Sequence, residues 1–170
     1  FKVWGPDDLS EEGIEEREAW MLKAGERWHG FGDLAEGFNL LDPIKATIIT
    51  PGLDVDGDFS DDNGIPAAIV TKYLAEHGVI VEKCGLYSFF IMFTIGITKG
   101  RWNTLVTALQ QFKDDYDRNH PLWKVLPEFV AEHPRYERVG LTELCTQIHA
   151  VYNARDIARL TTEIYLSNMI

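Results

Sequence analysis

The chain has 170 residues, of which 45% are hydrophobic and 25% charged, and its 27 acidic and 16 basic side chains give a formal net charge of −11. This length allows one domain with a real core, and the composition is that of a globular rather than a disordered protein. The acidic balance argues against a nucleic-acid-binding protein, which would need a basic face.

The two cysteines, Cys84 and Cys145, form neither a disulfide framework nor a Cys-x-x-Cys pair. We expect both to be free, mostly buried thiols in a reducing, cytoplasmic compartment. The longest apolar run, residues 89–97, is about half as long as a membrane span, so no membrane partner is expected. Neither Phe1 nor Ile170 resembles a natural terminus, which predicts a piece of a longer chain.

The first 40 residues are predicted to be a lead-in region. Glutamates at 11, 12, 15 and 16 suit the positive end of a helix dipole, so we expect a helix over about Ser10–Lys23, followed by a glycine-rich loop. The β-branched stretch Ile44–Thr50 predicts a strand. A helix is then expected from about Gly64 to His77, with Gly78 ending it.

Two more strands are predicted at Val79–Lys83 and Ser88–Ile97, the latter in the centre of the sheet. The next helix is the clearest in the chain, because apolar side chains recur at three- and four-residue steps and form one face. Its members are Trp102, Leu105, Val106, Leu109, Phe112 and Tyr116. Shorter helices are expected at about Leu122–Ala131, Thr142–Val151 and Asp156–Leu166.

These elements predict an α/β (α+β) fold. It contains a small mixed sheet in β-α-β-β-α order, packed by helices and followed by a helical tail. We divide the chain into a lead-in region at 1–40, a small α/β domain at 41–120 and a helical segment at 121–170.

Most residue patterns that suggest chemistry fail on spacing. Counted from Asp54, an EF-hand loop would need Gly and Glu where Phe59 and Ile65 stand. The five histidines show no metal-binding spacing, so no metal site is predicted. Lys72 and Lys99 sit in ordinary helical surface patterns, and we assign both to solvent rather than to a Schiff base.

Glu82 is the exception, because it interrupts an apolar strand just before Lys83. It could be an edge-strand carboxylate paired with Lys83 or with solvent. It could also point into a pocket and bind a cation through a charge-assisted hydrogen bond. The residues alone leave both interpretations open.

Several ordered blocks resemble one family at matching spacing. They are Trp28–Phe31, Leu41–Lys45, Thr50–Gly52, Gly64–Val70, Tyr73–Lys83, Phe93–Lys99 and Leu126-Pro127. Together they are similar to the bacterial ornithine/lysine/arginine decarboxylases, which are fold-type I pyridoxal-phosphate enzymes. The resemblance covers about residues 27–150 and implies a C-terminal portion of such an enzyme.

The resemblance implies that the cofactor, pyridoxal 5'-phosphate, is bound by an upstream domain. The Schiff-base lysine of the family lies in a Ser-x-His-Lys motif, and this sequence has no such motif. We therefore expect no catalytic and no cofactor-binding residue here, and no activity from this chain alone. The other partners implied are the rest of the polypeptide, a basic amino-acid substrate, and further copies in a homodimer or higher oligomer.

Glu82 is the one site residue that the resemblance implies. In lysine members of the family a Glu in this Val-Glu-Lys strand lies near the distal amine of the substrate, and ornithine members also carry Glu there, whereas arginine members carry Thr. The blocks Gly100–Val106 and Pro121-Leu122 resemble the arginine branch instead. Giving more weight to the pocket residue, we expect lysine as the substrate, with ornithine or arginine as alternatives.

Two further expectations remain. Some lysine members bind a guanosine-type alarmone through an Arg shortly before the Leu-Pro pair, and Pro121 stands at that place here, so such inhibition is not expected. The alternative to an enzyme segment is an autonomous α/β interaction module without catalysis, supported by the lack of any complete catalytic set. An upstream reading frame that reaches a Ser-x-His-Lys motif would favour the enzyme.

Overall fold

The computed structural model of the chain describes residues 2–3, 21–26, 30–34, 39–42, 44–53, 58–60, 63–94 and 96–155. Four strands within these ranges form one sheet in the order β1-β2-β4-β3. They are β1 (Lys2–Val3), β2 (Lys45–Ile49), β3 (Lys83–Cys84) and β4 (Ser88–Met92). Every pairing between them is antiparallel, whereas we had expected a mixed sheet.

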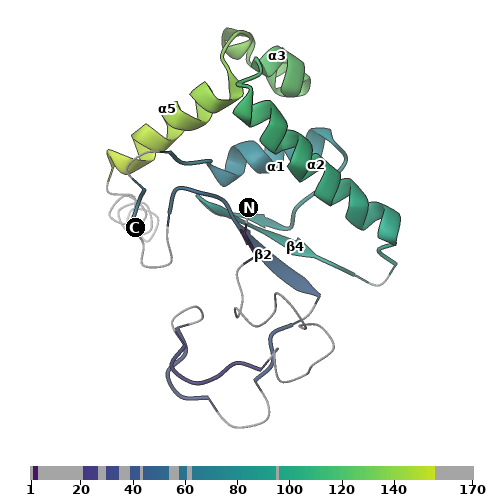
Figure 1. The fold of residues 1–170 in the computed structure, drawn as a ribbon, viewed down its shortest axis with the longest axis vertical. Coiled ribbons are helices and arrows are strands. Elements are labelled where there is room, and N and C mark those ends of the chain that lie inside the picture. The colour runs from purple at the N-terminus through teal and green to yellow at the C-terminus, as the bar shows by residue number, and fades with distance from the viewer. Residues whose placement is uncertain are drawn as a thin grey trace, which may run out of the picture.

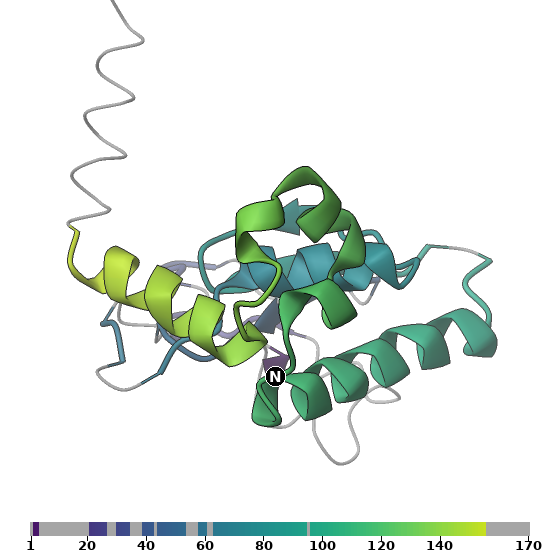
Figure 2. The ribbon, with the colours of Figure 1, turned by 90° about the horizontal axis from the view of Figure 1, so that it is seen from above.

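Helices lie on one side of this sheet, and the first of them packs directly on it (Figure 1). They are α1 (Ala67–Glu76), α2 (Lys99–Asp117), α3 (Leu122–Val125), α4 (Pro127–Glu132) and α5 (Leu141–Asn153), with a short 3-10 helix, η3, at Pro134–Tyr136. The order β2-α1-β3-β4-α2 and the helices that follow it confirm the predicted fold class. Seen from above, α2 and α5 extend to opposite sides of the molecule from the region where they meet (Figure 2).

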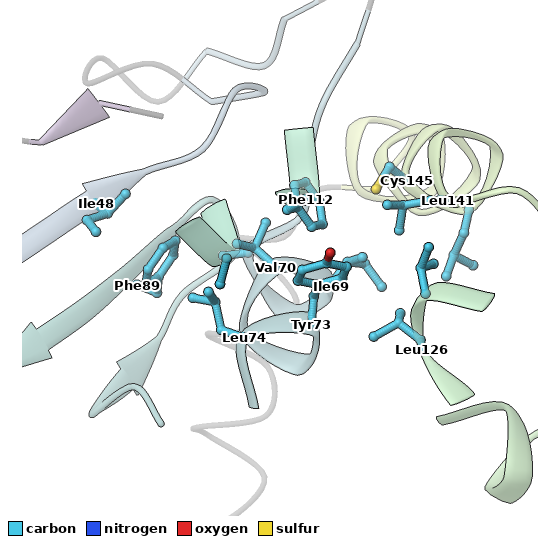
Figure 3. Packing of buried hydrophobic residues seen from close by; sticks show 14 of the residues in the cluster. Ile48, Ile69, Val70, Tyr73, Leu74, Phe89, Phe112, Leu126, Leu141 and Cys145 are labelled. Carbon is cyan, nitrogen blue, oxygen red and sulfur yellow. The ribbon is translucent and has the colours of Figure 1, made fainter. Parts of the chain in front are cut away.

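Helix α1 lies at the centre of the hydrophobic core (Figure 3). Val70 and Leu74 face Ile48 of β2 and Phe89 of β4, while Tyr73 faces away from the sheet toward the other helices. One buried cluster therefore extends from β2 to Leu141 and Cys145 of α5, across the expected boundary at residue 120. The three-part division of the chain stays a prediction.

Several predicted boundaries are wrong. The second strand was expected at 79–83 but includes only Lys83 and Cys84, because residue 79 is still bonded to the end of α1: Val79 N–H donates to the Leu74 carbonyl at 2.9 Å. The third strand ends at Met92 rather than Ile97, since the chain turns at Gly96, which has a φ of 97°.

The two ends of the chain lie mostly outside the described residues. This applies to most of the expected helix over 10–23 and to the whole of the one over 156–166. Residues 21–23 of the former are described and are not helical, because Met21 forms an antiparallel bridge with Leu40. Trp28, Asp54 and Asp56 also lie outside the described residues.

The two thiols differ, which corrects the expectation that both are buried. Cys145 is fully buried in α5, and this burial raises the pKa of its thiol to about 12. Cys84 is exposed, because β3 is the edge strand and no neighbouring strand covers it. Both cysteines are free.

Candidate functional site

Glu82 directly precedes the edge strand β3, and its backbone is held by the sheet. Its N–H donates to the Phe90 carbonyl of β4 at 2.9 Å. The side chain is exposed, and no residue of the described ranges forms a hydrogen bond or ion pair with its carboxylate. The suggested pairing with Lys83 is therefore absent within the described part of the chain, and the carboxylate is accessible to a ligand.

The lysines expected in solvent are not poised for Schiff-base chemistry. Lys99 is exposed at the start of α2, and Lys72 is half-buried in the middle of α1. Such a lysine needs a desolvated pocket with a cofactor beside it. Neither residue lines any of the three cavities described below, so the described residues do not fit pyridoxal phosphate.

An open groove of about 840 Å³ lies between α2, α5 and the segment after β2. Asn119, which has a φ of 49°, caps α5 at one side of it by accepting hydrogen bonds from the N–H groups of Thr142 (3.0 Å) and Glu143 (3.3 Å). Among the described residues that line it, Asp117 and Glu143 are the charged ones. A phosphate group prefers cationic donors, so this groove does not suit one.

A second hollow, of about 300 Å³, lies against the sheet between β2, β3 and β4. Thr47, Lys83 and Phe90 are paired neighbours across the three strands and line it together. Of the described residues in this lining, Lys83 alone is charged, so they offer an ammonium group and apolar surface but no carboxylate.

A polar network links α1, α2 and α3. Asp115 accepts hydrogen bonds from the Tyr73 hydroxyl and from His120 Nδ1, each at 2.7 Å, and Lys124 Nζ lies 3.3 Å from His120 Nε2. Burial and then the Asp115 carboxylate raise the pKa of Tyr73 well above its usual range. The adjoining hollow is small, about 230 Å³. All of these groups satisfy one another, which indicates a cross-link between helices rather than a reactive centre.

A buried hydrogen-bonded pair joins β4's N-terminal flank to α5. His149, which is 4% exposed, has its Nε2 2.9 Å from the Ser60 carbonyl and its Nδ1 2.6 Å from the Tyr87 hydroxyl. Because a carbonyl only accepts, Nε2 carries the proton and Tyr87 donates to Nδ1. A side chain at Gly64 would collide with the His149 ring, since its Cβ would lie 2.0 Å from Nδ1. The pair thus fixes the chain before α1 against α5.

Sequence reasoning did not single out Tyr87, His149, Asp115 or His120. Tyr87 and His149 are 62 residues apart, and Tyr73 and Asp115 are 42 apart. Neither pair has a local spacing that signals contact, so no motif in the sequence could have identified them.

We expect Tyr87→Phe to lower the free energy of unfolding by about 1–3 kcal/mol, because His149 Nδ1 would be left buried without a donor. Burial, with smaller contributions from Tyr152 and Cys145, raises the pKa of Tyr87 from 10.0 to about 12. Between these two values the unfolded tyrosine loses its proton and the folded one keeps it, so stability should fall as pH rises from 10 to 12.

Urea unfolding of the 170-residue chain at a series of pH values checks both expectations. Tyr136→Phe, near the surface at η3, is the control and should retain the alkaline loss of stability. An alkaline loss just as large in Tyr87→Phe would contradict the assignment of this titration to Tyr87.

Among the described residues, no group of three or more His, Cys, Asp or Glu side chains could hold a metal ion. None of the described helices is both long enough and apolar enough to cross a bilayer.

Comparison with known proteins identifies the family. Residues 1–101 match the family model described as "Orn/Lys/Arg decarboxylase, major domain". The lysine decarboxylase LdcA of Pseudomonas aeruginosa is 48% identical over 168 residues, which is 97% of this chain and 22% of that protein. The biodegradative arginine decarboxylase of Escherichia coli is 40% identical over 129 residues, 75% of this chain and 17% of that protein.

A solved structure agrees with these matches. Lysine decarboxylase A from Pseudomonas aeruginosa superimposes with a TM-score of 0.81 at 49% identity, covering 94% of this chain and 21% of that structure. The chain therefore belongs to the Orn/Lys/Arg decarboxylase family. It spans about a fifth of the length of the curated relatives it matches.

Proposed function

We propose that this chain is a C-terminal segment of a pyridoxal-phosphate-dependent decarboxylase that converts lysine to cadaverine and CO2. The observation that carries the proposal is the 48% identity to a lysine decarboxylase along nearly the whole chain. The arginine enzyme matches at lower identity and over less of the chain. Ornithine and arginine remain the alternative substrates.

In this proposal the segment forms a wall on the substrate side of the active site, and the rest of the polypeptide supplies the cofactor site. Pyridoxal phosphate, when bound there, would take up the electron pair left as CO2 departs. Glu82 binds the distal ammonium group of the substrate. An exposed carboxylate without an internal partner supports this role, since a charge-assisted hydrogen bond to an ammonium is stronger than one between neutral groups.

We infer a cytoplasmic protein that works as a homodimer or higher oligomer on a basic amino acid. One exposed and one buried free thiol are compatible with a reducing compartment.

The deciding experiment measures CO2 release by the full-length protein from L-lysine, L-ornithine and L-arginine, each with added pyridoxal phosphate. We expect the highest kcat/KM with lysine. The 170-residue chain by itself should release no CO2 and bind no cofactor. Equal or greater activity on arginine would contradict the substrate assignment, and full-length protein inactive on all three would contradict the enzyme assignment.

A further inference from the structure

The segment between α1 and β3 alternates between the core and the surface. Val79 and Val81 pack against the hydrophobic core, whereas Ile80 is 88% exposed and Glu82 is exposed. Among the exposed large hydrophobic side chains of the described residues, Ile80 is the most accessible, and the next is Phe31 at 55%. An apolar side chain so fully in water has no role in the packing of this chain.

Alternation places Ile80 and Glu82 on the same side of the segment. The segment lies outside the strands and bends at Glu82, but Val79 and Val81 pack on the core while the side chains of Ile80 and Glu82 are exposed, so both of these lie on the solvent side. Hydrogen bonds anchor the backbone near each end: Val79 N–H donates to Leu74 and Glu82 N–H to Phe90, both at 2.9 Å. The apolar group and the carboxylate are therefore presented together from a fixed backbone.

This pair matches a ligand with an aliphatic chain that ends in a cation. A branched hydrocarbon such as Ile80 can cover methylene groups, and a carboxylate one step further on can accept hydrogen bonds from an ammonium. Lys83 does not oppose the cation within this pair, because it points to the other side and lines the cavity at Thr47 and Phe90.

We propose that Ile80 is a specificity-determining residue that contacts the methylene chain of the substrate while Glu82 binds its distal ammonium group. This assignment rests on the proposed function and deepens it. The site would select substrates by the number of methylene groups, because only a chain of the right length covers Ile80 and still reaches the Glu82 carboxylate. A hydrophobic contact of this kind discriminates by about tenfold or more for one methylene.

The test is steady-state decarboxylation by full-length Ile80→Thr and Ile80→Val proteins. For Ile80→Thr we expect the KM for lysine to rise about tenfold and the preference for lysine over ornithine in kcat/KM to fall about tenfold, with kcat within about twofold. Ile80→Val, which removes one methylene and keeps an apolar branched side chain, should raise the KM about fourfold. If the Ile80→Thr protein does not fold, the KM of Ile80→Val provides the test instead.

Val151→Thr is the matched control, since Val151 is an exposed apolar residue on α5, and it should leave both quantities unchanged. If the wild type is active and both Ile80 substitutions leave the lysine KM and the lysine-to-ornithine preference unaltered, this assignment alone is overturned. That holds even if the thermal midpoint falls, because Ile80 would then only pack against another part of the protein. A full-length wild type that releases no CO2 from lysine overturns the proposed function, and this assignment with it.

Discussion

Replacing Glu82 by Gln in the full-length protein is expected to raise the KM for lysine about 10- to 100-fold. The substitution keeps the size of the side chain and removes its charge, so it weakens a charge-assisted hydrogen bond to the distal ammonium group, which contributes roughly 1.5–3 kcal/mol. The distal group is remote from the bond that breaks, so kcat should change much less than the KM.

Two companion variants sharpen this expectation. Glu82→Asp retains the charge on a shorter side chain and should give an intermediate KM. Glu132→Gln removes an exposed charge from α4 and should leave the KM unchanged, which controls for a change in overall charge. Steady-state kinetics with lysine measures all three. An unaltered KM in Glu82→Gln would assign the residue to solvent at the sheet edge, the other interpretation of its position.

Phe112→Ala should lower the free energy of unfolding of the 170-residue chain by about 3–5 kcal/mol, the usual cost of a buried phenylalanine replaced by alanine. Phe112 is completely buried in α2 and meets the Tyr73 ring edge to face, with centroids 5.2 Å apart. The cavity would open between α1 and α2, beside the Tyr73–Asp115 hydrogen bond. Since a domain has about 5–15 kcal/mol of stability in total, this is a large share of it.

Urea unfolding followed by circular dichroism measures the change, with Gln110→Ala as the control. Gln110 is exposed on the same helix, so its replacement should alter the stability by no more than about 0.5 kcal/mol. Phe112→Leu should fall between the two, because it refills part of the cavity. A loss below about 1 kcal/mol in Phe112→Ala would show that the core between α1 and α2 is not as tightly packed as described.

Local signals in the sequence predicted the succession β2-α1-β3-β4-α2 and the helices that follow it up to α5. The three- and four-residue steps from Leu105 to Phe112 identified α2, and both side chains are buried as that pattern requires. Gly78 was predicted to end α1 and does so with a φ of 78°. The interior position of β4 followed from its Phe- and Ile-rich composition and is confirmed by the strand order. These features depend on neighbours within one element.

The family, too, was accessible from the sequence, because ordered blocks at fixed spacing are a property of the chain itself, and the comparisons confirm it. The sequence also singled out Glu82, and its role stays a prediction. What it could not decide was which side of the segment after α1 faces the core. Val79, Ile80 and Val81 are all apolar, so composition alone predicts a strand that is buried on both sides.

Only the tertiary structure decided the long-range contacts. Helix α1 packs on the sheet in a way that partly buries Val79 and Val81 and leaves Ile80 and Glu82 exposed to water. The same packing brings His149 to Tyr87 and Asp115 to Tyr73 across 62 and 42 residues. Hydrophobic periodicity fixes which face of each element is buried, but contacts between distant elements depend on how those faces are stacked in space. That stacking determines where the polar groups of this protein meet.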